Sequence, residues 1–202
     1  MAPNSEVRAA YGARADEYTA LLGSVEAMAA PDRETIEGWA RSLDGRALDV
    51  GCGPGHWTQH VRGLGVDITG VDLVPEFVEG ARRRFPDVPF ELGDLEALPA
   101  ADDSLGGILA WYSVIHTPPA DVPGVLGEFA RCIRPGGSLL IGFFDGERVE
   151  PFDHAVVTAY YWPVVEMAGL LVEAGFDIVE THTRTDPGHR PYGAILARRI
   201  AV

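Results

Sequence analysis

The chain has 202 residues, of which 47% are hydrophobic, and this is enough for one α/β domain with a buried core. Its formal net charge is −14, and all 16 of its Lys and Arg positions are arginine. An acidic surface repels the phosphates of nucleic acids and of anionic membranes, so we expect neither as a partner. The two cysteines, Cys52 and Cys132, are too few for a disulfide framework or a zinc site, and we expect no metal.

No secretory signal or membrane span is visible in the sequence. The first residues lack an apolar signal core, and no stretch of about 20 apolar residues exists to cross a bilayer. These features predict a cytoplasmic protein, and we expect it to be a monomer or a homodimer.

Two helices are predicted before the first strand. The first spans Ser5 to Leu22, with Ser5 as its N-cap, and places Tyr11 and Tyr18 on one face. The second runs from Pro31 to about Ser42 and leads directly into an apolar strand. Arg33 therefore lies near the far end of that strand, where its guanidinium can reach a ligand carboxylate.

A strand, a glycine turn and a helix follow one another between residues 47 and 64. Ala47–Val50 is an apolar strand, Gly51, Gly53 and Gly55 form the turn, and a helix begins at His56. Glycines let the backbone come close to a ligand, and free N–H groups at a helix start favour anionic or polar ligands. The sequence therefore predicts a ligand site at this turn.

The next strand, Val66–Asp72, ends in an acid. Asp72 lies 21 positions after Gly51 (72 minus 51). In doubly wound folds, an acid about 20 residues past the glycine turn binds ribose hydroxyls, because a carboxylate accepts from both hydroxyls at once. We expect this role for Asp72.

The middle of the chain continues to alternate helices with apolar strands, as in a parallel α/β sheet. The predicted elements are a helix over Pro75–Phe85, a strand over Val88–Leu92, a strand over Leu105–Tyr112, a helix that Pro118–Asp121 initiates and that ends near Arg134, and a strand over Ser138–Phe144. Ligands bind at the carboxyl ends of such strands. Trp111, Tyr112 and His116 should therefore border the site.

The last part of the chain contains a long connection and a strand pair. Residues 145–158 form a loop longer than is usual in α/β units, and we interpret residues 145–162 as a lid-like insertion over an acceptor. A helix over Val164–Ala174 precedes two alternating strands, Phe176–Thr183 and Gly193–Ile200. The turn between these strands, residues 185–191, is expected at the same edge as the glycine turn.

Several of these motifs together resemble class I S-adenosylmethionine (SAM) methyltransferases of the bacterial small-molecule type, similar to the ubiquinone/menaquinone branch. The motifs are Asp49-x-Gly51-x-Gly53-x-Gly55, Val71-Asp72-Leu73, Gly93-Asp94-Leu95, the aromatic end of the fourth strand with His116, and Arg134-Pro135-Gly136-Gly137. The chain departs from the family at Gly106, where an Asp is usual.

The resemblance implies a Rossmann-like α/β fold with a seven-stranded, mostly parallel sheet, an antiparallel last strand and helices on both faces. Residues 1–202 would form a single domain, with residues 1–42 as an N-terminal helical cap. Tyr11 would close over the methionine end of SAM, as a Tyr of the capping helix does in the family. Asp94 would accept from the adenine amine while Leu95 packs on the ring.

The cofactor-binding residues expected on this basis surround SAM, with S-adenosylhomocysteine (SAH) as product. They are Tyr11, Arg33, Asp49, Gly51, Cys52, Gly53, Gly55, His56, Trp57, Asp72, Leu73, Gly93, Asp94, Leu95, Ala110 and Trp111.

The acceptor is expected to be a small molecule in a chamber rich in aromatic residues. Its predicted contacts are Tyr112, His116, Phe144, Tyr161, Arg190 and Tyr192. Methyl transfer to O, N or C is an in-line displacement that chiefly requires positioning. If a base is used, the candidates are His116, His154 and His189, because imidazole titrates near neutrality.

Three other functions are compatible with the sequence. They are a SAM-binding enzyme that does not transfer methyl, a non-catalytic SAM-binding module, and an NAD-linked reductase. The one-residue-shorter glycine spacing and the absence of lysine argue against a short-chain reductase, which needs a Tyr-x-x-x-Lys pair. A binding-only module would not need the aromatic and imidazole side chains on the acceptor side.

Overall fold

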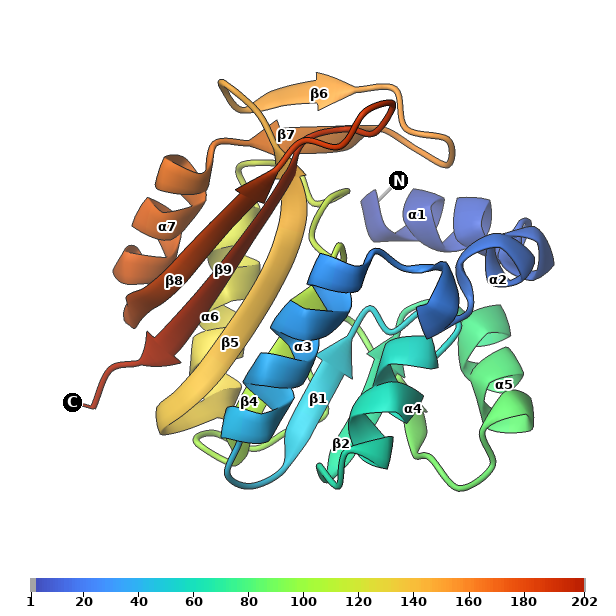
Figure 1. Cartoon of the computed structure of the whole chain (residues 1–202), viewed down its shortest axis with the longest axis horizontal. Helices are drawn as coiled ribbons and strands as arrows, with labels where there is room; N and C mark the ends of the chain where they lie inside the picture. Colours follow the sequence, from blue (N-terminus) through green and yellow to red (C-terminus); the bar gives the residue numbers. More distant parts are fainter. Residues whose placement is uncertain (1–2, 202) are drawn as a thin grey trace.

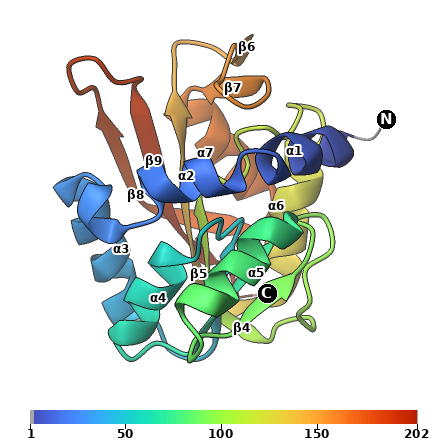
Figure 2. The same ribbon diagram turned by 90° about the vertical axis from the view of Figure 1, so that its right-hand side faces the viewer.

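The computed structural model describes residues 3–201 and shows a mixed sheet with helices on both faces (Figures 1 and 2). The strands are β1 (Ala47–Val50), β2 (Ile68–Asp72), β3 (Phe90–Leu92), β4 (Leu105–Trp111), β5 (Ile133–Asp145), β6 (Glu150–Phe152), β7 (Ala159–Trp162), β8 (Phe176–Arg184) and β9 (Tyr192–Arg199). The helices are α1 (Pro3–Gly12), α2 (Ala15–Leu22), α3 (Ala30–Ser42), α4 (His56–Gly63), α5 (Pro75–Arg84), α6 (Val122–Cys132) and α7 (Val164–Glu173), with a short 3₁₀ turn, η1 (Val25–Ala27).

The strand order confirms the predicted Rossmann-like fold. Strands β3, β2, β1, β4 and β5 are parallel neighbours in that order. The last strand, β9, is antiparallel to β5 and to β8, between which it lies. The insertion adds two strands to the seven expected: β7 pairs with the end of β5, and β6 pairs with β7. The carboxyl ends of β1, β2, β4 and β5 share one edge of the sheet.

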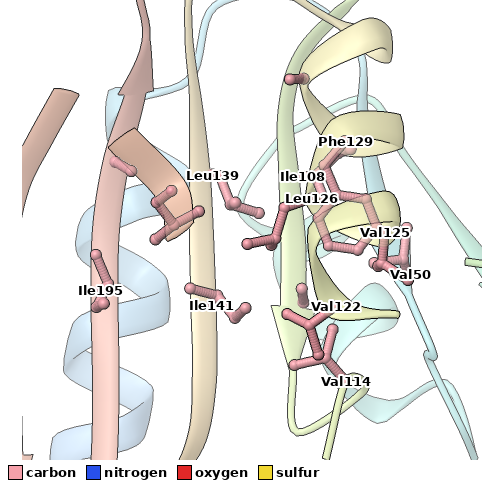
Figure 3. Packing of buried hydrophobic residues seen from close by; sticks show 14 of the residues in the cluster. Val50, Ile108, Val114, Val122, Val125, Leu126, Phe129, Leu139, Ile141 and Ile195 are labelled. Carbon is pink, nitrogen blue, oxygen red and sulfur yellow. The ribbon is translucent and has the colours of Figure 1, made fainter. Parts of the chain in front are cut away.

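The central strands are apolar because both of their faces are covered. On one face, residues of β1, β4 and β5 pack against α6 and α7 (Figure 3). Phe129 and Leu126 of α6 are fully buried there against Ile108. On the opposite face, Trp39 of α3 and Trp57 of α4 pack against Leu109 and its neighbours. This two-sided burial fixes where the strands end, and thereby the edge that carries the site.

The predicted N-terminal helix is in fact two helices, so the expectation of one helix from Ser5 to Leu22 was wrong. The first begins at Pro3, which puts Ser5 inside the helix instead of at its cap, and it ends at Gly12. Glycine is common at helix ends and weakens a helix interior. The break after Gly12 also lets Tyr11 and Tyr18 both pack against Phe77. The turn brings the rings of Tyr11 and Tyr18 edge to face, with centroids 5.5 Å apart, and both pack against Phe77 of α5.

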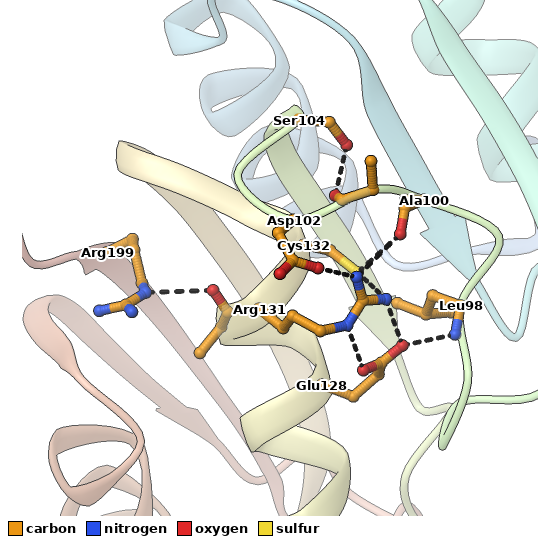
Figure 4. Close-up of polar contacts among 10 residues, drawn as sticks. Leu98, Ala100, Asp102, Ser104, Glu128, Arg131, Cys132 and Arg199 are labelled. Carbon is orange, nitrogen blue, oxygen red and sulfur yellow. Dashed lines mark hydrogen bonds and ion pairs between the residues drawn. The ribbon is translucent and has the colours of Figure 1, made fainter.

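A polar network fixes the loop that leads into β4 (Figure 4). The Arg131 guanidinium, at the end of α6, donates to both carboxylate oxygens of Glu128 at 2.7 Å and to Asp102 at 2.6 Å. The same Glu128 carboxylate accepts from the Leu98 N–H at 2.7 Å. Charge-assisted, bidentate contacts of this kind hold the backbone of residues 98–102 against α6.

Gly106 follows the start of β4, where the pairing with β5 shifts register. Its N–H donates to the Arg46 carbonyl at 2.7 Å, and a Cβ on Gly106 would lie 1.9 Å from the Asp44 carbonyl oxygen. The chain before β1 therefore crosses β4 at a point where only glycine fits. A side chain at position 106, such as the Asp that is usual in the family, would therefore clash with the Asp44 carbonyl in this chain.

We predict that Gly106→Ala destabilises the fold by about 3 kcal/mol or more, because backbone cannot move away from the new methyl group as a side chain can. Denaturant unfolding measures the change. Gly127→Ala is the matched control, because Gly127 lies in α6 and an added Cβ there meets nothing within 4 Å. That variant should be stabilised by about 0.5–1 kcal/mol through helix propensity. Equal stabilities of the two variants would contradict the contact at Gly106.

Candidate functional site

A cavity of about 690 Å³ opens at the carboxyl ends of β1, β2 and β4. Residues of α1 and α2 and residues of the turn between β8 and β9 line it. Figure 1 shows these segments at the same end of the sheet. This volume lies within the range of small-molecule and cofactor sites.

The glycine turn presents bare backbone to the cavity. Gly51, Gly53 and Gly55 have φ values of 68°, 52° and 81°, a left-handed region that favours glycine. A Cβ on Gly53 would meet no protein atom within 4 Å, whereas a Cβ on Gly51 would lie 2.4 Å from Ser113 Cβ. Gly51, Cys52 and Gly53 line the cavity. Gly55 does not; it packs against Phe90 and lets α4 begin close to α5.

Asp72 ties the end of β2 to this turn. One of its carboxylate oxygens accepts from the Gly53 N–H at 2.7 Å, and the other accepts from the Val74 N–H at 2.8 Å. Burial raises the pKa of Asp72 to about 6, and the backbone donors oppose that rise. Asp72 and its neighbour Leu73 line the cavity. A carboxylate can accept about four hydrogen bonds, so Asp72 retains capacity for a ligand hydroxyl.

Beneath the turn lies a second buried carboxylate, Asp49. It accepts from the Thr58 hydroxyl at 2.6 Å, and burial raises its pKa to about 7. His56, the first residue of α4, is 8% exposed, and burial lowers its pKa to about 4. Neither of its ring nitrogens has a partner within residues 3–201. Asp49, His56 and Trp57 line the cavity.

The segment after β3 reaches the cavity where α1 crosses it. Gly93, Asp94 and Leu95 are lining residues. The Asp94 carboxylate accepts from the Asn4 amide at 2.9 Å and from the Glu96 N–H at 3.0 Å. The N-terminal helix is thus held to the segment that the sequence predicts at the adenine.

Aromatic rings wall the opposite end of the cavity. Tyr112 directly follows β4 with a φ of 57°, which is unusual for a residue other than glycine. This conformation turns its ring toward Phe144, with centroids 5.0 Å apart, and toward Tyr192, at 6.3 Å. The Trp111 ring lies 5.7 Å from that of Tyr192. All four residues line the cavity.

The three candidate bases also reach the cavity, but in different settings. The His116 ring lies between the Tyr11 hydroxyl, 2.9 Å from Nε2, and the Thr158 carbonyl, 2.8 Å from Nδ1. His154 lies beside it, with ring centroids 5.1 Å apart, and burial lowers the pKa of His154 to about 4. His189 is exposed on the turn between β8 and β9.

Three other expected site residues do not line the cavity. Arg33 lies one residue past Asp32, which does line it. Ala110 is buried in the core of the sheet. Tyr161 lies behind Arg190, which donates to its hydroxyl at 3.1 Å and itself reaches the cavity.

One polar feature of the cavity escaped the sequence reasoning. Asp32 at the start of α3 pairs with Arg184 at the end of β8, at 2.8 Å, and Arg184 also binds Asp186 at 2.6 Å. The Arg184 guanidinium lies over the Tyr192 ring, 4.7 Å from its centroid. Residues 152 apart in sequence form this pair, so no local pattern indicates it.

Within residues 3–201 no group of three His, Cys, Asp or Glu side chains is arranged to hold a metal ion. In the same part of the chain, no helix combines the length and apolar character that crossing a bilayer requires.

Comparison with known proteins places this site in a family. A methyltransferase domain model matches residues 47–137, which contain the glycine turn, Asp72 and Asp94. A malonyl-[acyl-carrier protein] O-methyltransferase of Serratia marcescens is 33% identical over 130 residues. A demethylmenaquinone methyltransferase of Beutenbergia cavernae is 29% identical over 167 residues.

Over residues 47–137 the chain matches the methyltransferase domain of the class I SAM-dependent family. The match to the Serratia enzyme covers 62% of this chain and 50% of that enzyme. The match to the Beutenbergia enzyme covers 81% of this chain and 68% of that enzyme. The chain thus spans about half to two thirds of the length of these relatives. Among solved structures, the fold is similar to a 1,6-didemethyltoxoflavin-N1-methyltransferase of Burkholderia thailandensis, with a TM-score of 0.78 and 22% identity. That likeness covers 100% of this chain and 92% of the other. The family resemblance seen in the motifs is confirmed.

We predict that Asp72→Asn weakens SAH binding about 10- to 100-fold at pH 8, because hydrogen bonds to a charged group contribute about 1.5–3 kcal/mol. The carboxylate must be ionised to accept from two hydroxyls. Since the pKa of Asp72 is raised to about 6, the affinity of the wild type is full above that pH and falls as the pH drops through it.

Titration calorimetry between pH 5 and 8 measures both effects. Asp87→Asn is the control, because Asp87 is exposed and does not line the cavity. Unchanged affinity in Asp72→Asn would contradict the assignment.

Proposed function

We propose that this protein transfers the methyl group of SAM to a small molecule with a flat, conjugated ring. The observation that carries the proposal is the contrast between the two ends of one cavity. One end offers glycine backbone and the Asp72 carboxylate, and the other offers aromatic rings and imidazoles.

The residues at the first end fit an adenosyl cofactor. The surface at Gly53 is backbone without a Cβ, so a ligand can approach it closely. Asp72 is placed to hold the ribose hydroxyls, and Asp94 the adenine amine. The first turn of α4 beside them directs helix N–H groups toward the carboxylate of the methionine portion.

When bound, SAM supplies a methyl group on a positively charged sulfur with a neutral leaving group. The protein has to hold the acceptor in line with that methyl, an effect that can lower the barrier by about 7–11 kcal/mol at best. The ring faces of Trp111, Tyr112 and Tyr192 favour a nearby cation.

The acceptor end favours a flat ring over an extended or highly charged molecule. Tyr112, Phe144 and Tyr192 present ring surfaces, and the Arg184 charge is already neutralised by Asp32 and Asp186. By their names, the Burkholderia and Beutenbergia enzymes act on 1,6-didemethyltoxoflavin and on demethylmenaquinone. These names support a small-molecule acceptor here.

Of the three candidate bases, His116 is the best placed, because it lines the cavity just after β4 and is held by two hydrogen bonds. His154 is adjacent to it, and His189 lies at the outer mouth of the cavity. The hairpin of β6 and β7 lies next to these imidazoles, which supports its role as a lid.

Two measurements test the proposal. Calorimetry should give a micromolar dissociation constant for SAH, typical of cofactor sites, and no binding of NADH. Methyl-labelled SAM, incubated with the protein and a fractionated bacterial metabolite extract, should yield label in a small aromatic product. No SAH binding would contradict the cofactor assignment. SAH binding without label transfer to any fraction would favour a SAM-binding enzyme of another kind or a binding module.

A further inference from the structure

A chain of two hydrogen bonds crosses the cavity from α1 to the insertion. The Tyr11 hydroxyl oxygen lies 2.9 Å from His116 Nε2, and His116 Nδ1 lies 2.8 Å from the Thr158 carbonyl oxygen. A carbonyl only accepts, so Nδ1 must carry the hydrogen. In a neutral ring Nε2 is then the acceptor, and the Tyr11 hydroxyl donates to it. The geometry thus fixes both the tautomer of His116 and the direction of the Tyr11 hydrogen.

This chain brings together three segments that are distant in sequence. Tyr11 comes from α1, His116 follows β4, and Thr158 precedes β7. Both Tyr11 and His116 line the cavity. Packing holds the Tyr11 ring in place, because its centroid lies 5.5 Å from that of His116 and 5.9 Å from that of Phe77. The hydroxyl and the imidazole are therefore held at fixed positions in the cavity wall.

The surroundings keep both groups uncharged near neutral pH. Burial raises the pKa of Tyr11, and the nearby Tyr18 and Asp72 raise it further. Burial lowers the pKa of His116, and the bond to Thr158 opposes this only partly. The titratable groups that face Tyr11 are Tyr18 and Asp72. His116 faces His154, and the charges near His154 are those of Arg14 and Arg190.

We propose that Tyr11 and His116 form a proton relay that removes the proton from an acidic O–H or N–H of the acceptor. The proposal rests on the methyl-transfer function and deepens it, since it names the class of acceptor. That class is a conjugated ring bearing a phenolic or enolic hydroxyl, or an acidic ring N–H.

The atoms and charges of this step balance. The acceptor O–H or N–H bond breaks, and its proton goes to the Tyr11 oxygen while the Tyr11 proton passes to His116 Nε2. The electron pair left on the acceptor forms the new bond to the methyl carbon, and the sulfur keeps the pair of the bond that breaks. One positive charge leaves the sulfur and one appears on the imidazole, which later releases its proton to water.

The base in this relay, the His116 imidazole, is weak, and this indicates how acidic the O–H or N–H of the acceptor has to be. An imidazole whose pKa lies below its ordinary value accepts a proton efficiently only from a group of comparable acidity. Aliphatic alcohols are far less acidic than that, whereas hydroxyls and N–H groups conjugated to an electron-poor ring come close. The ring surfaces of Tyr112 and Phe144 beside the relay suit such an acceptor.

The first test needs no acceptor and uses the complex with SAH. Nitrogen NMR of the histidine rings, with His116 assigned by comparison with His116→Gln, should show a neutral ring at pH 7 with the hydrogen on Nδ1. Tyr11→Phe should shift the Nε2 resonance, whereas Tyr18→Phe should leave it unchanged, since the Tyr18 ring packs on Tyr11 without bonding to His116. A hydrogen on Nε2, a charged ring at pH 7, or no response to Tyr11→Phe would overturn the relay.

The second test uses the initial rate of label transfer from SAM to the active extract fraction. At saturating SAM, Tyr11→Phe and His116→Gln should each lower this rate about 10²- to 10⁴-fold, the usual contribution of proton transfer. The wild-type rate should fall as the pH drops below the lowered pKa of His116, because the base must be unprotonated. That acidic limb should vanish in His116→Gln.

Tyr18→Phe is the matched control for packing of the N-terminal helices and should retain the wild-type rate. If SAH binds and label is transferred at the full rate in Tyr11→Phe, the relay is wrong and methyl transfer stands. If the wild type binds no SAH, the proposed function itself fails.

Discussion

The hydrogen bond from the Gly53 N–H to the Asp72 carboxylate, at 2.7 Å, is the contact on which the site depends. It joins the turn after β1 to the end of β2, and it exists only because the two strands are parallel neighbours in register. It also requires the left-handed backbone at Gly53, which glycine adopts without strain. One carboxylate therefore both shapes the turn and remains available to a ligand.

Burying carboxylates at this turn is unfavourable, and the pKa values of the two buried acids show it. Asp49 in β1 and Asp72 at the end of β2 are both buried and both line the cavity, and burial raises the pKa of each. Such groups are stable when charged only if donors surround them, and backbone N–H groups and the Thr58 hydroxyl supply these donors. A folded pKa above the unfolded value means that ionisation at higher pH lowers stability. Strained or costly groups of this kind gather at functional sites.

The sequence was most informative where the pattern is local. The glycine turn, the acid at position 72 and the alternation of strands and helices follow from spacing within short stretches, and the structure has them as expected. Contacts across the chain could not be predicted in this way. The break at Gly12, the pairing of β6 with β7, the bond of Tyr11 to His116 and the Asp32–Arg184 pair all depend on segments that meet only after folding. The positions of Ala110 and Tyr161 outside the cavity likewise depend on which way a strand faces.

A crystal structure of the protein with SAH would show whether Asp72 and the glycine turn hold the cofactor. We expect the adenosyl ribose on the Asp72 carboxylate, the glycine turn along the cofactor, and the sulfur facing the space beside Tyr11 and His116. Adenosine bound elsewhere, or a ribose without contact to Asp72, would contradict it.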